Sequence, residues 1–395
     1  MQGIFSDRIS DVPRSFIREI LKVAIDPTII SFAGGLPNRD LFPVEEIKKA
    51  AIRVLEEDGK RALQYGNSEG LFELRKYISE RYMKKQHLEI PVENILITNG
   101  SQQALDLLAK VILNEGDSVV VEEPGYLGAL QTFSVYRARL IPVPVDEEGM
   151  DVGALKTTLL NEKIKLIYTV PNFQNPSGIT YSDRNREEIA HLLRGKATIL
   201  VEDNPYGELR FSGENKRSFR AIIPENAVLL GSFSKIVAPG VRLGWIVAPD
   251  FLMEKIITAK QAADLHTNCL SQRVVYQYLV DNDVDLHVKK IVEVYGRQRT
   301  MMLSSIKAHF PASVKSTEPD GGMFLWVTLP RGMSAMKLFH ESIKRKVAFV
   351  PGDPFYVNKT DVNTIRLNFS CSDEKTIEIG IRRLADVIKK NLRYL

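Results

Sequence analysis

The sequence predicts an α/β protein with a large domain, in which a mostly parallel seven-stranded sheet lies between helices, and a smaller α+β domain. Three observations support this prediction. Short runs rich in Val and Ile alternate with helical patterns from about residue 91 to 250. These runs are apolar almost throughout, as strands buried on both faces are. The last third of the chain changes to long amphipathic patterns. With 395 residues, 44% of them hydrophobic, the chain can bury a large core in more than one domain.

Seven runs are expected to form the large sheet. In chain order they are "ENILIT", "DSVVVEE", "ARLIPVPV", "IKLIYTV", "ATILVED", "AVLLGS" and "LGWIVA". Between the first two, apolar residues from Ala104 to Ile112 recur at helical spacing, and Gly116 stands where such a helix would stop. Strands that alternate with helices in this way are typical of a parallel sheet covered on both faces.

The last third predicts the second domain. The stretch "VVYQYLVDNDVDLHVKKIVEVYGRQRTMMLSSIKAHF" predicts long amphipathic helices, and three strand candidates, "GGMFLWVTL", "VAFVPG" and "TIRLNFS", follow it. We expect the large domain to span residues 42–290, and residues 1–41 and 291–395 to form an N-terminal segment and a small domain. Such a division would place a cleft between the two parts, where small ligands often bind.

Composition narrows the possible partners. The net charge is +4, from 53 basic and 49 acidic residues, which is too balanced to indicate nucleic acid or a membrane as the main partner. The only two cysteines, Cys269 and Cys371, lie far apart and lack metal-ligand spacing, so we expect a reducing compartment and no metal site. The N-terminal "MQGIFSDRIS" has no apolar signal core, and a cytoplasmic protein is the expectation.

The stretch "GSFSKIVAPGVRLGW" draws attention to Lys235. A lysine is most often a solvated surface residue, but this one follows a buried-type strand and stands between Ser234 and the turn at Pro239 and Gly240. Ligands bind at the carboxyl ends of strands in open α/β sheets. There, burial can remove the charge of a lysine and make it a nucleophile.

Three other predicted strand ends carry polar residues. Asp203 ends "TILVED", with Tyr206 three residues on, and "PNFQNPSG" contains Asn175. "ITNGSQQ" leads into a helix that we expect to start near Ser101, where free backbone N–H groups suit a phosphate. Each motif alone could be an ordinary turn or cap. Their joint occurrence at strand ends indicates one binding site.

With these motifs in place, the chain resembles the class I/II aminotransferases, which are fold type I enzymes that use pyridoxal 5′-phosphate (PLP). The resemblance covers nearly the whole chain and includes "SFAGGLPNRDLFP", "LQYGNSEGLFELR", "NGSQQALDL", "EEPGYLGAL", "PNFQNPSG", "EDNPYGEL", "SFSKIVAPGVRLGW", "GGMFLW", "PGDPFY" and "IRLNFS". "AGGLPN" and "GSQQALDL" are most similar to the 2-aminoadipate, kynurenine and aromatic aminotransferase branch.

The resemblance implies a role for each motif. Lys235 would form the Schiff base with PLP and transfer the proton, and Asp203 would keep the pyridine nitrogen protonated. Asn175 and Tyr206 would bind the ring hydroxyl oxygen, and Tyr126 would stack on the ring. The residues implied for the phosphate are Ser101, Gln102, Ser232, Ser234 and Arg242.

Four further residues receive roles toward substrate. Arg366 would bind the α-carboxylate, although by itself a strand arginine is more often in a surface ion pair. Tyr65 would reach the phosphate of a neighbouring subunit, which implies a homodimer with shared sites. Arg18 would lie in a helix that covers the substrate, or face outward on an ordinary amphipathic helix, and Gly35 would let the chain pass close by. His266 and the two cysteines receive no role.

Amino transfer from an amino acid to a 2-oxo acid such as 2-oxoglutarate is the leading functional hypothesis. The donor would be 2-aminoadipate, kynurenine, glutamate or an aromatic amino acid. A β-lyase or decarboxylase would need nearly the same motifs and stays an alternative. A third alternative is a PLP-binding sensor domain of a transcription regulator. We expect it less, because the resemblance begins within the first few tens of residues and leaves little room for a winged helix.

Overall fold

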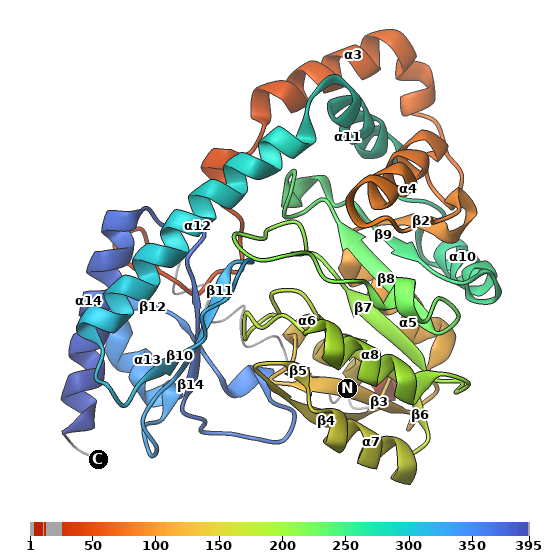
Figure 1. Ribbon diagram of the computed structural model, residues 1–395. Coiled ribbons are helices and arrows are strands. Elements are labelled where there is room, and N and C mark those ends of the chain that lie inside the picture. Colours follow the sequence, from red (N-terminus) through yellow and green to blue (C-terminus); the bar gives the residue numbers. More distant parts are fainter. Residues whose placement is uncertain (1–3, 11, 13–25, 394–395) are drawn as a thin grey trace.

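The computed structural model describes residues 4–10, 12 and 26–393. Its largest sheet runs through the body of the protein (Figure 1). In spatial order its strands are β2 (Ile95–Thr98), β9 (Gly244–Val247), β8 (Ala227–Ser232), β7 (Ile199–Asp203), β6 (Ile164–Thr169), β3 (Ser118–Glu123), β4 (Arg139–Asp146) and β5 (Gly149–Met150).

Seven of these strands are the seven runs predicted from sequence. The neighbouring pairs from β8 across to β4 are all parallel, whereas β9 is antiparallel to both β8 and β2. The short β5 adds an eighth strand, antiparallel to β4. It escapes the sequence pattern because it is only two residues long. The α/β fold class is confirmed, with a mixed sheet in which β9 and β5 are the reversed strands.

The central strands are buried on both faces. Along β3, Val119 and Val121 belong to one hydrophobic cluster, and Val120 between them belongs to a second. The same alternation separates Leu200 from Val201 on β7. Successive side chains of a strand point to opposite faces, so two apolar layers cover the sheet. This explains why the strand sequences are almost continuously apolar.

Helices cover the two faces of the sheet and surround the domain (Figure 1). One apolar layer includes residues of α5 (Ser101–Ile112) and α10 (Asp250–Asp264), and the other includes residues of α8 (Asp183–Leu193). Between residues 44 and 281 the structure also contains helices α3 (Val44–Ala62), α4 (Phe72–Gln86), α6 (Leu127–Val135), α7 (Val152–Asn161), α9 (Phe219–Ile222) and α11 (Cys269–Asp281).

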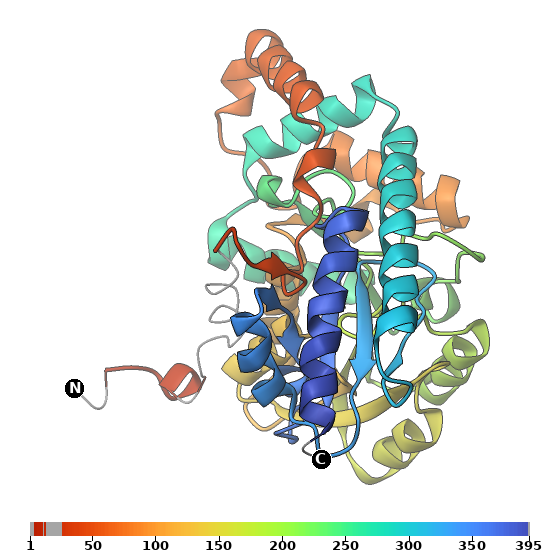
Figure 2. The same cartoon turned by 90° about the vertical axis from the view of Figure 1, so that its left-hand side faces the viewer.

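The last third forms a second, antiparallel sheet. Its strand order is β10 (Lys315–Ser316), β11 (Phe324–Thr328), β14 (Thr364–Asn368) and β13 (Val350–Pro351). The long helix α12 (Val284–His309) runs across from the region of α11 and packs beside α14 (Glu374–Leu392), as Figures 1 and 2 show. Helix α13 (Ala335–Lys344) also packs against α14.

The N-terminal segment is joined to this second region by hydrogen bonds. Strand β1 (Ile30–Ser31) pairs in parallel with β12 (Val347–Ala348), and the backbone N–H of Asn368 donates to the carbonyl of Phe32. The first helix, α1 (Asp7–Ser10), lies further toward the N-terminus. The expected boundary between residues 290 and 291 falls inside α12, and this division remains a prediction. Within the described residues, no helix is long and apolar enough to cross a membrane.

Candidate active site

A cavity of about 500 Å³ lies at the carboxyl ends of the large sheet's strands. Asp203 is the last residue of β7, Asn175 follows β6, and Lys235 lies three residues beyond the end of β8. The cavity is lined by twelve residues predicted from sequence: Gly35, Ser101, Gln102, Tyr126, Asn175, Asp203, Tyr206, Ser232, Ser234, Lys235, Arg242 and Arg366. The fold therefore brings together motifs that lie more than 300 residues apart in the chain.

Asp203 is 2% exposed, and only one of its two carboxylate oxygens is paired within the described part of the chain. Its Oδ2 accepts a hydrogen bond from the Tyr168 hydroxyl at 2.8 Å, whereas its buried Oδ1 has no partner among those residues. Burial raises the pKa of Asp203 to about 6, and the hydrogen bond from Tyr168 opposes that rise. An unpaired buried carboxylate oxygen is costly unless a ligand satisfies it. A protonated ring nitrogen is a donor that fits Oδ1.

Lys235 presents its amine to the same cavity. Its Nζ donates to the carbonyl oxygen of Gly35 at 3.0 Å and lies 5.8 Å from the centre of the Tyr206 ring. Burial lowers the pKa of Lys235, Cys371 raises it and the charges of Arg366 and Arg242 lower it, which together leave the pKa at about 8. At pH 7 a lysine with such a pKa is mostly charged, but its neutral fraction, about one tenth, far exceeds that of an ordinary lysine, as a nucleophile or proton acceptor requires.

Arg366 projects from β14 into the cavity and is 3% exposed. Its Nη1 donates to the side-chain oxygen of Asn175 and its Nη2 to the carbonyl of Ala33, both at 2.8 Å. Its buried Nε has no acceptor in residues 4–10, 12 and 26–393, which the structure describes. Burial lowers the pKa of Arg366 to about 10, so the guanidinium stays charged at neutral pH. A desolvated, positioned guanidinium with a free N–H suits a carboxylate ligand.

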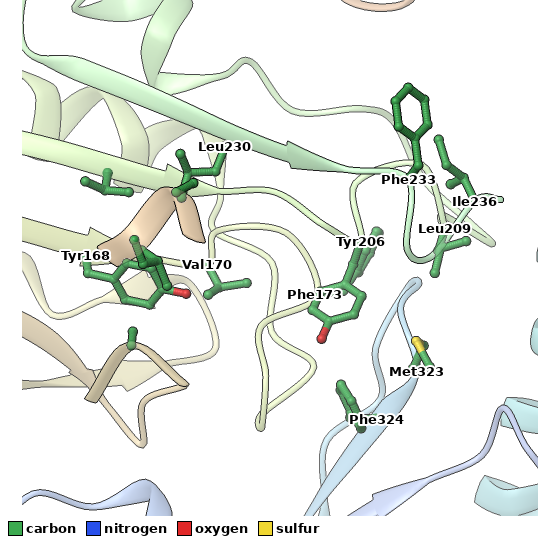
Figure 3. Packing of buried hydrophobic residues seen from close by; sticks show 14 of the residues in the cluster. Tyr168, Val170, Phe173, Tyr206, Leu209, Leu230, Phe233, Ile236, Met323 and Phe324 are labelled. Carbon is green, nitrogen blue, oxygen red and sulfur yellow. The ribbon is translucent and has the colours of Figure 1, made fainter. Parts of the chain in front are cut away.

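Aromatic rings support this end of the cavity. The Arg366 guanidinium lies over the Phe324 ring, 4.4 Å from its centre. Tyr206, in the loop that follows β7, and Phe324, the first residue of β11, meet edge to face, with ring centres 5.8 Å apart (Figure 3). The Tyr206 hydroxyl also accepts a long hydrogen bond, 3.5 Å, from the side-chain amide of Asn175. Residues from the large sheet's loops and from the second sheet therefore meet at the cavity.

The start of α5 and Arg242 form another part of the cavity wall. Gly100 precedes the helix with a φ of 77°, and a Cβ there would lie 2.6 Å from the Arg242 guanidinium. Arg242 donates from Nη2 to the carbonyl of Asn99 at 3.2 Å. Ser101 and Gln102 begin the helix, and the Ser232 hydroxyl accepts from the backbone N–H of Ser234 at 3.0 Å. A helix start beside an arginine is suited to a phosphate.

Tyr126 lies half-buried at the start of α6 and lines the cavity, and burial raises its pKa to about 12. Tyr65 does not reach the cavity of its own chain: it is 79% exposed and meets the His266 ring edge to face. Arg18 lies outside the described residues. Cys269 and Cys371 are both free thiols.

Sequence reasoning missed some neighbours of these residues. Tyr168, the hydrogen-bond partner of Asp203, lies inside the predicted strand "IKLIYTV", but only the pairing of β6 with β7 brings the two together. Further lining residues that were missed are Leu127, Gly128, Gln131, Val170, Pro205 and Pro239. All but Gln131 lie inside a motif or strand candidate quoted above, but their side chains gave no reason to assign them a role.

PLP fits the chemical groups that line the cavity. The cavity offers a free carboxylate oxygen on Asp203, an amine on Lys235, and a helix start beside Arg242. These are a partner for a ring nitrogen, a nucleophile for an aldehyde and a site for a phosphate.

Comparisons with known proteins agree with this chemistry. The family described as Aminotransferase class I and II matches residues 27–384. The chain is 42% identical to the Aromatic-amino-acid aminotransferase 1 of Thermococcus litoralis, over 98% of this chain and 95% of that protein.

Two solved structures are similar over nearly their whole length. The kynurenine aminotransferase of Pyrococcus horikoshii, in complex with PMP, KYN as substrates and KYA as products, has a TM-score of 0.94 at 42% identity and covers 98% of each chain. An alpha-aminoadipate aminotransferase from Thermus thermophilus, complexed with N-(5′-phosphopyridoxyl)-L-leucine, has a TM-score of 0.92 at 39% identity and covers 99% of this chain and 98% of that one.

Fold and cavity together define an enzyme that uses PLP as its cofactor. The chain belongs to the class I and II aminotransferases, and it transfers amino groups between small amino and 2-oxo acids.

Proposed function

We propose that the enzyme moves the amino group of 2-aminoadipate, kynurenine, glutamate or an aromatic amino acid to a 2-oxo acid such as 2-oxoglutarate. The similarity to the aromatic and kynurenine aminotransferases supports this donor class. The observation that carries the proposal is one cavity with the Lys235 amine, the free Asp203 oxygen and the unpaired Nε of Arg366.

In this proposal Asp203, Asn175 and Tyr206 hold the cofactor ring, and Tyr126 covers its face. Residues that would hold the phosphate are Ser101, Gln102, Ser232, Ser234 and Arg242. When bound, PLP supplies the electron sink that lets an amino acid lose its Cα proton. Asp203 keeps that sink effective because its carboxylate, once paired with a ring N–H⁺, favours the charged form of both groups.

Lys235 would carry the proton. With its pKa lowered by burial, its neutral amine can accept a proton near Cα of the substrate and release it to the other reacting carbon. Arg366 would bind the α-carboxylate and so orient the Cα–H bond toward Lys235. The carbonyl of Gly35 accepts from the Lys235 amine at 3.0 Å, and a Cβ at Gly35 would lie in ordinary contact with the Phe324 ring at 3.5 Å and 4.0 Å from Arg366 Nη2. Arg18 would cover the substrate from the N-terminal helix.

We also propose a homodimer in which Tyr65 completes the phosphate site of the partner subunit. Its exposure of 79% supports this, because a large aromatic side chain on the surface is available for a second chain. The two free cysteines suit the reducing cytoplasm.

A donor panel tests the substrate proposal. The purified enzyme is given each amino acid with 2-oxoglutarate, and glutamate and the new 2-oxo acid are both measured. The proposal predicts turnover with 2-aminoadipate, kynurenine and phenylalanine. Turnover confined to donors outside these classes, such as alanine alone, would contradict it.

A further inference from the structure

One lysine, Lys260, is fully buried outside the cavity and contacts the first turn of α5. Lys260 is 0% exposed, although it lies in α10, whose other lysine, Lys255, has a side chain 64% exposed. Its Nζ donates to Gln103 Oε1 at 2.8 Å, Asp264 Oδ2 at 2.8 Å and Thr267 Oγ1 at 2.9 Å. All three ammonium hydrogens are thus satisfied, as the burial of a charge requires.

The acceptors of Lys260 connect it to the residue before the helix start. Gln103 Oε1 also accepts from the backbone N–H of Asn99 at 2.8 Å. Asp264 Oδ2 accepts from the side-chain amide of Asn99 at 2.6 Å and from Gln103 Nε2 at 2.7 Å. Lys260 therefore fixes which way the Gln103 amide faces, since only the amide oxygen can accept from the ammonium. Asn99 is held by its backbone and by its side chain.

The third hydrogen bond of Asn99 leads to the cavity. Its carbonyl oxygen accepts from Nη2 of Arg242 at 3.2 Å. The next residue, Gly100, has no side chain with which to cap α5, so Gln103 reaches back across the first turn instead. The orientation of the Asn99 peptide sets both the place of Arg242 and the start of α5.

We propose that Lys260 is a positioning residue for the cofactor phosphate, acting through Gln103 and Asn99 on Arg242 and on the first turn of α5. It touches neither substrate nor cofactor. The inference rests on the proposed assignment of Arg242 and the start of α5 to the phosphate. It adds a cluster, formed by Lys260, Asp264, Gln103, Asn99 and Thr267, that keeps these donors aimed at one point. Donors fixed before binding need no ordering when the phosphate arrives, and this raises affinity.

Binding of PLP and of pyridoxal to the apoprotein tests the proposal, because the two ligands differ only in the phosphate. Equilibrium titrations of wild type, Lys260→Met, Gln103→Leu and the double variant give both dissociation constants without any turnover. We expect Lys260→Met to weaken PLP binding by roughly 10- to 100-fold and pyridoxal binding by less than about 3-fold. The double variant should lose no more than the worse single variant, since both act on one path. Lys255→Met, a lysine loss on the exposed side of α10, should change neither constant.

The outcomes distinguish the positioning role of Lys260 from the assignment of Arg242 and the start of α5 to the phosphate. If Lys260→Met and Gln103→Leu weaken PLP and pyridoxal by the same factor, or weaken neither, Lys260 has no positioning role toward the phosphate. Arg242→Gln should lower the preference for PLP over pyridoxal as well. If Arg242→Gln leaves that preference unchanged, the phosphate assignment itself is wrong. Should Lys260→Met fail to fold, as judged by its thermal midpoint, Gln103→Leu decides alone, because it keeps the Lys260–Asp264 ion pair.

Discussion

The Tyr168 hydroxyl donates a hydrogen bond to Oδ2 of Asp203, a residue that lines the cavity, whereas the other carboxylate oxygen, Oδ1, has no hydrogen-bond partner among the described residues. The two oxygens therefore have different tasks. One is held by the protein, which keeps the carboxylate oriented, and the other is available to the cofactor ring.

Tyr168→Phe is expected to shift the acid limb of the pH profile of kcat/KM. Burial raises the pKa of Asp203 and the hydrogen bond from Tyr168 lowers it, and the net value is about 6. Without the bond the pKa rises, so Asp203 becomes protonated at a higher pH. The acid limb of kcat/KM should shift upward by roughly 1 pH unit, equivalent to about 1.4 kcal/mol. Tyr136→Phe, which removes a hydroxyl bound to the distant Asp106, is the control. Superimposable pH profiles for wild type and Tyr168→Phe would show that the bond does not tune Asp203.

Asp203→Asn should retain the shape of the side chain and lose its charge. A neutral amide no longer favours a protonated ring nitrogen, so the half-reaction with an amino acid should slow at least about 100-fold, or about 2.7 kcal/mol. Asp203→Glu should do less harm if the longer chain can be accommodated. Single-turnover absorbance measures the rate. Equal rates for wild type and Asp203→Asn rule out the role of Asp203.

Arg366 and Arg18 should affect substrates differently. Arg366→Ala removes the proposed partner of the α-carboxylate and should damage kcat/KM for every donor. Arg18→Ala should weaken glutamate and 2-aminoadipate by roughly 10- to 100-fold, from the loss of about 1.5–3 kcal/mol of charged hydrogen bonding. Phenylalanine and kynurenine should change much less. If Arg18→Ala lowers all four donors equally, or none, Arg18 does not select substrates.

Tyr65 offers a test of the shared site. Tyr65→Ala and Lys235→Ala should each be nearly inactive as homodimers. Mixed under conditions that exchange subunits, they should regain part of the activity, since a hybrid dimer holds one site with both residues intact. Size measurement of the active species accompanies the mixing. An active monomer in native mass measurement would contradict the proposed dimer.

The stability of the apoprotein should reveal the cost of burying Lys235. Its pKa is lowered from 10.5 to about 8 by burial. Below pH 8 Lys235 is charged in both the folded and the unfolded protein, and burial of this charge lowers the free energy of unfolding. Between pH 8 and pH 10.5 only the unfolded chain keeps the proton, so the free energy of unfolding rises with pH. Lys235→Met should therefore be more stable than wild type by about 1–3 kcal/mol at pH 7. In denaturant titrations this difference should shrink toward pH 10. A difference independent of pH would mean that Lys235 is not desolvated.

The fold and most of the candidate site could be predicted from sequence because both follow local rules. Strands buried on both faces are apolar throughout, and polar residues at their carboxyl ends meet at one edge of the sheet. Asp203, Lys235 and Asn175 carried such signals, whereas the role of Arg242 was implied by the family resemblance. Tyr168 did not, because an aromatic residue inside a strand is ordinary and only the pairing of β6 with β7 reveals its partner.

Other features depend on contacts that no short pattern records. The short β5 follows from the turn after β4, and its Gly149 has a φ of 131°. The burial of Lys260 depends on Asn99 and Gln103, which are more than 150 residues away in the chain. On a helical pattern, Lys260 is indistinguishable from the exposed Lys255.

The most direct test of the central claim is one half-reaction with the purified, PLP-loaded enzyme. An amino acid such as 2-aminoadipate is added without an acceptor, and the absorbance of the cofactor and the released product are followed together. The account predicts one 2-oxo acid released per active site as PLP changes to its amine form, reversal on addition of 2-oxoglutarate, and neither change in Lys235→Ala. Release of ammonia or carbon dioxide with unchanged PLP would contradict amino transfer, and an equal rate in Lys235→Ala would contradict the site.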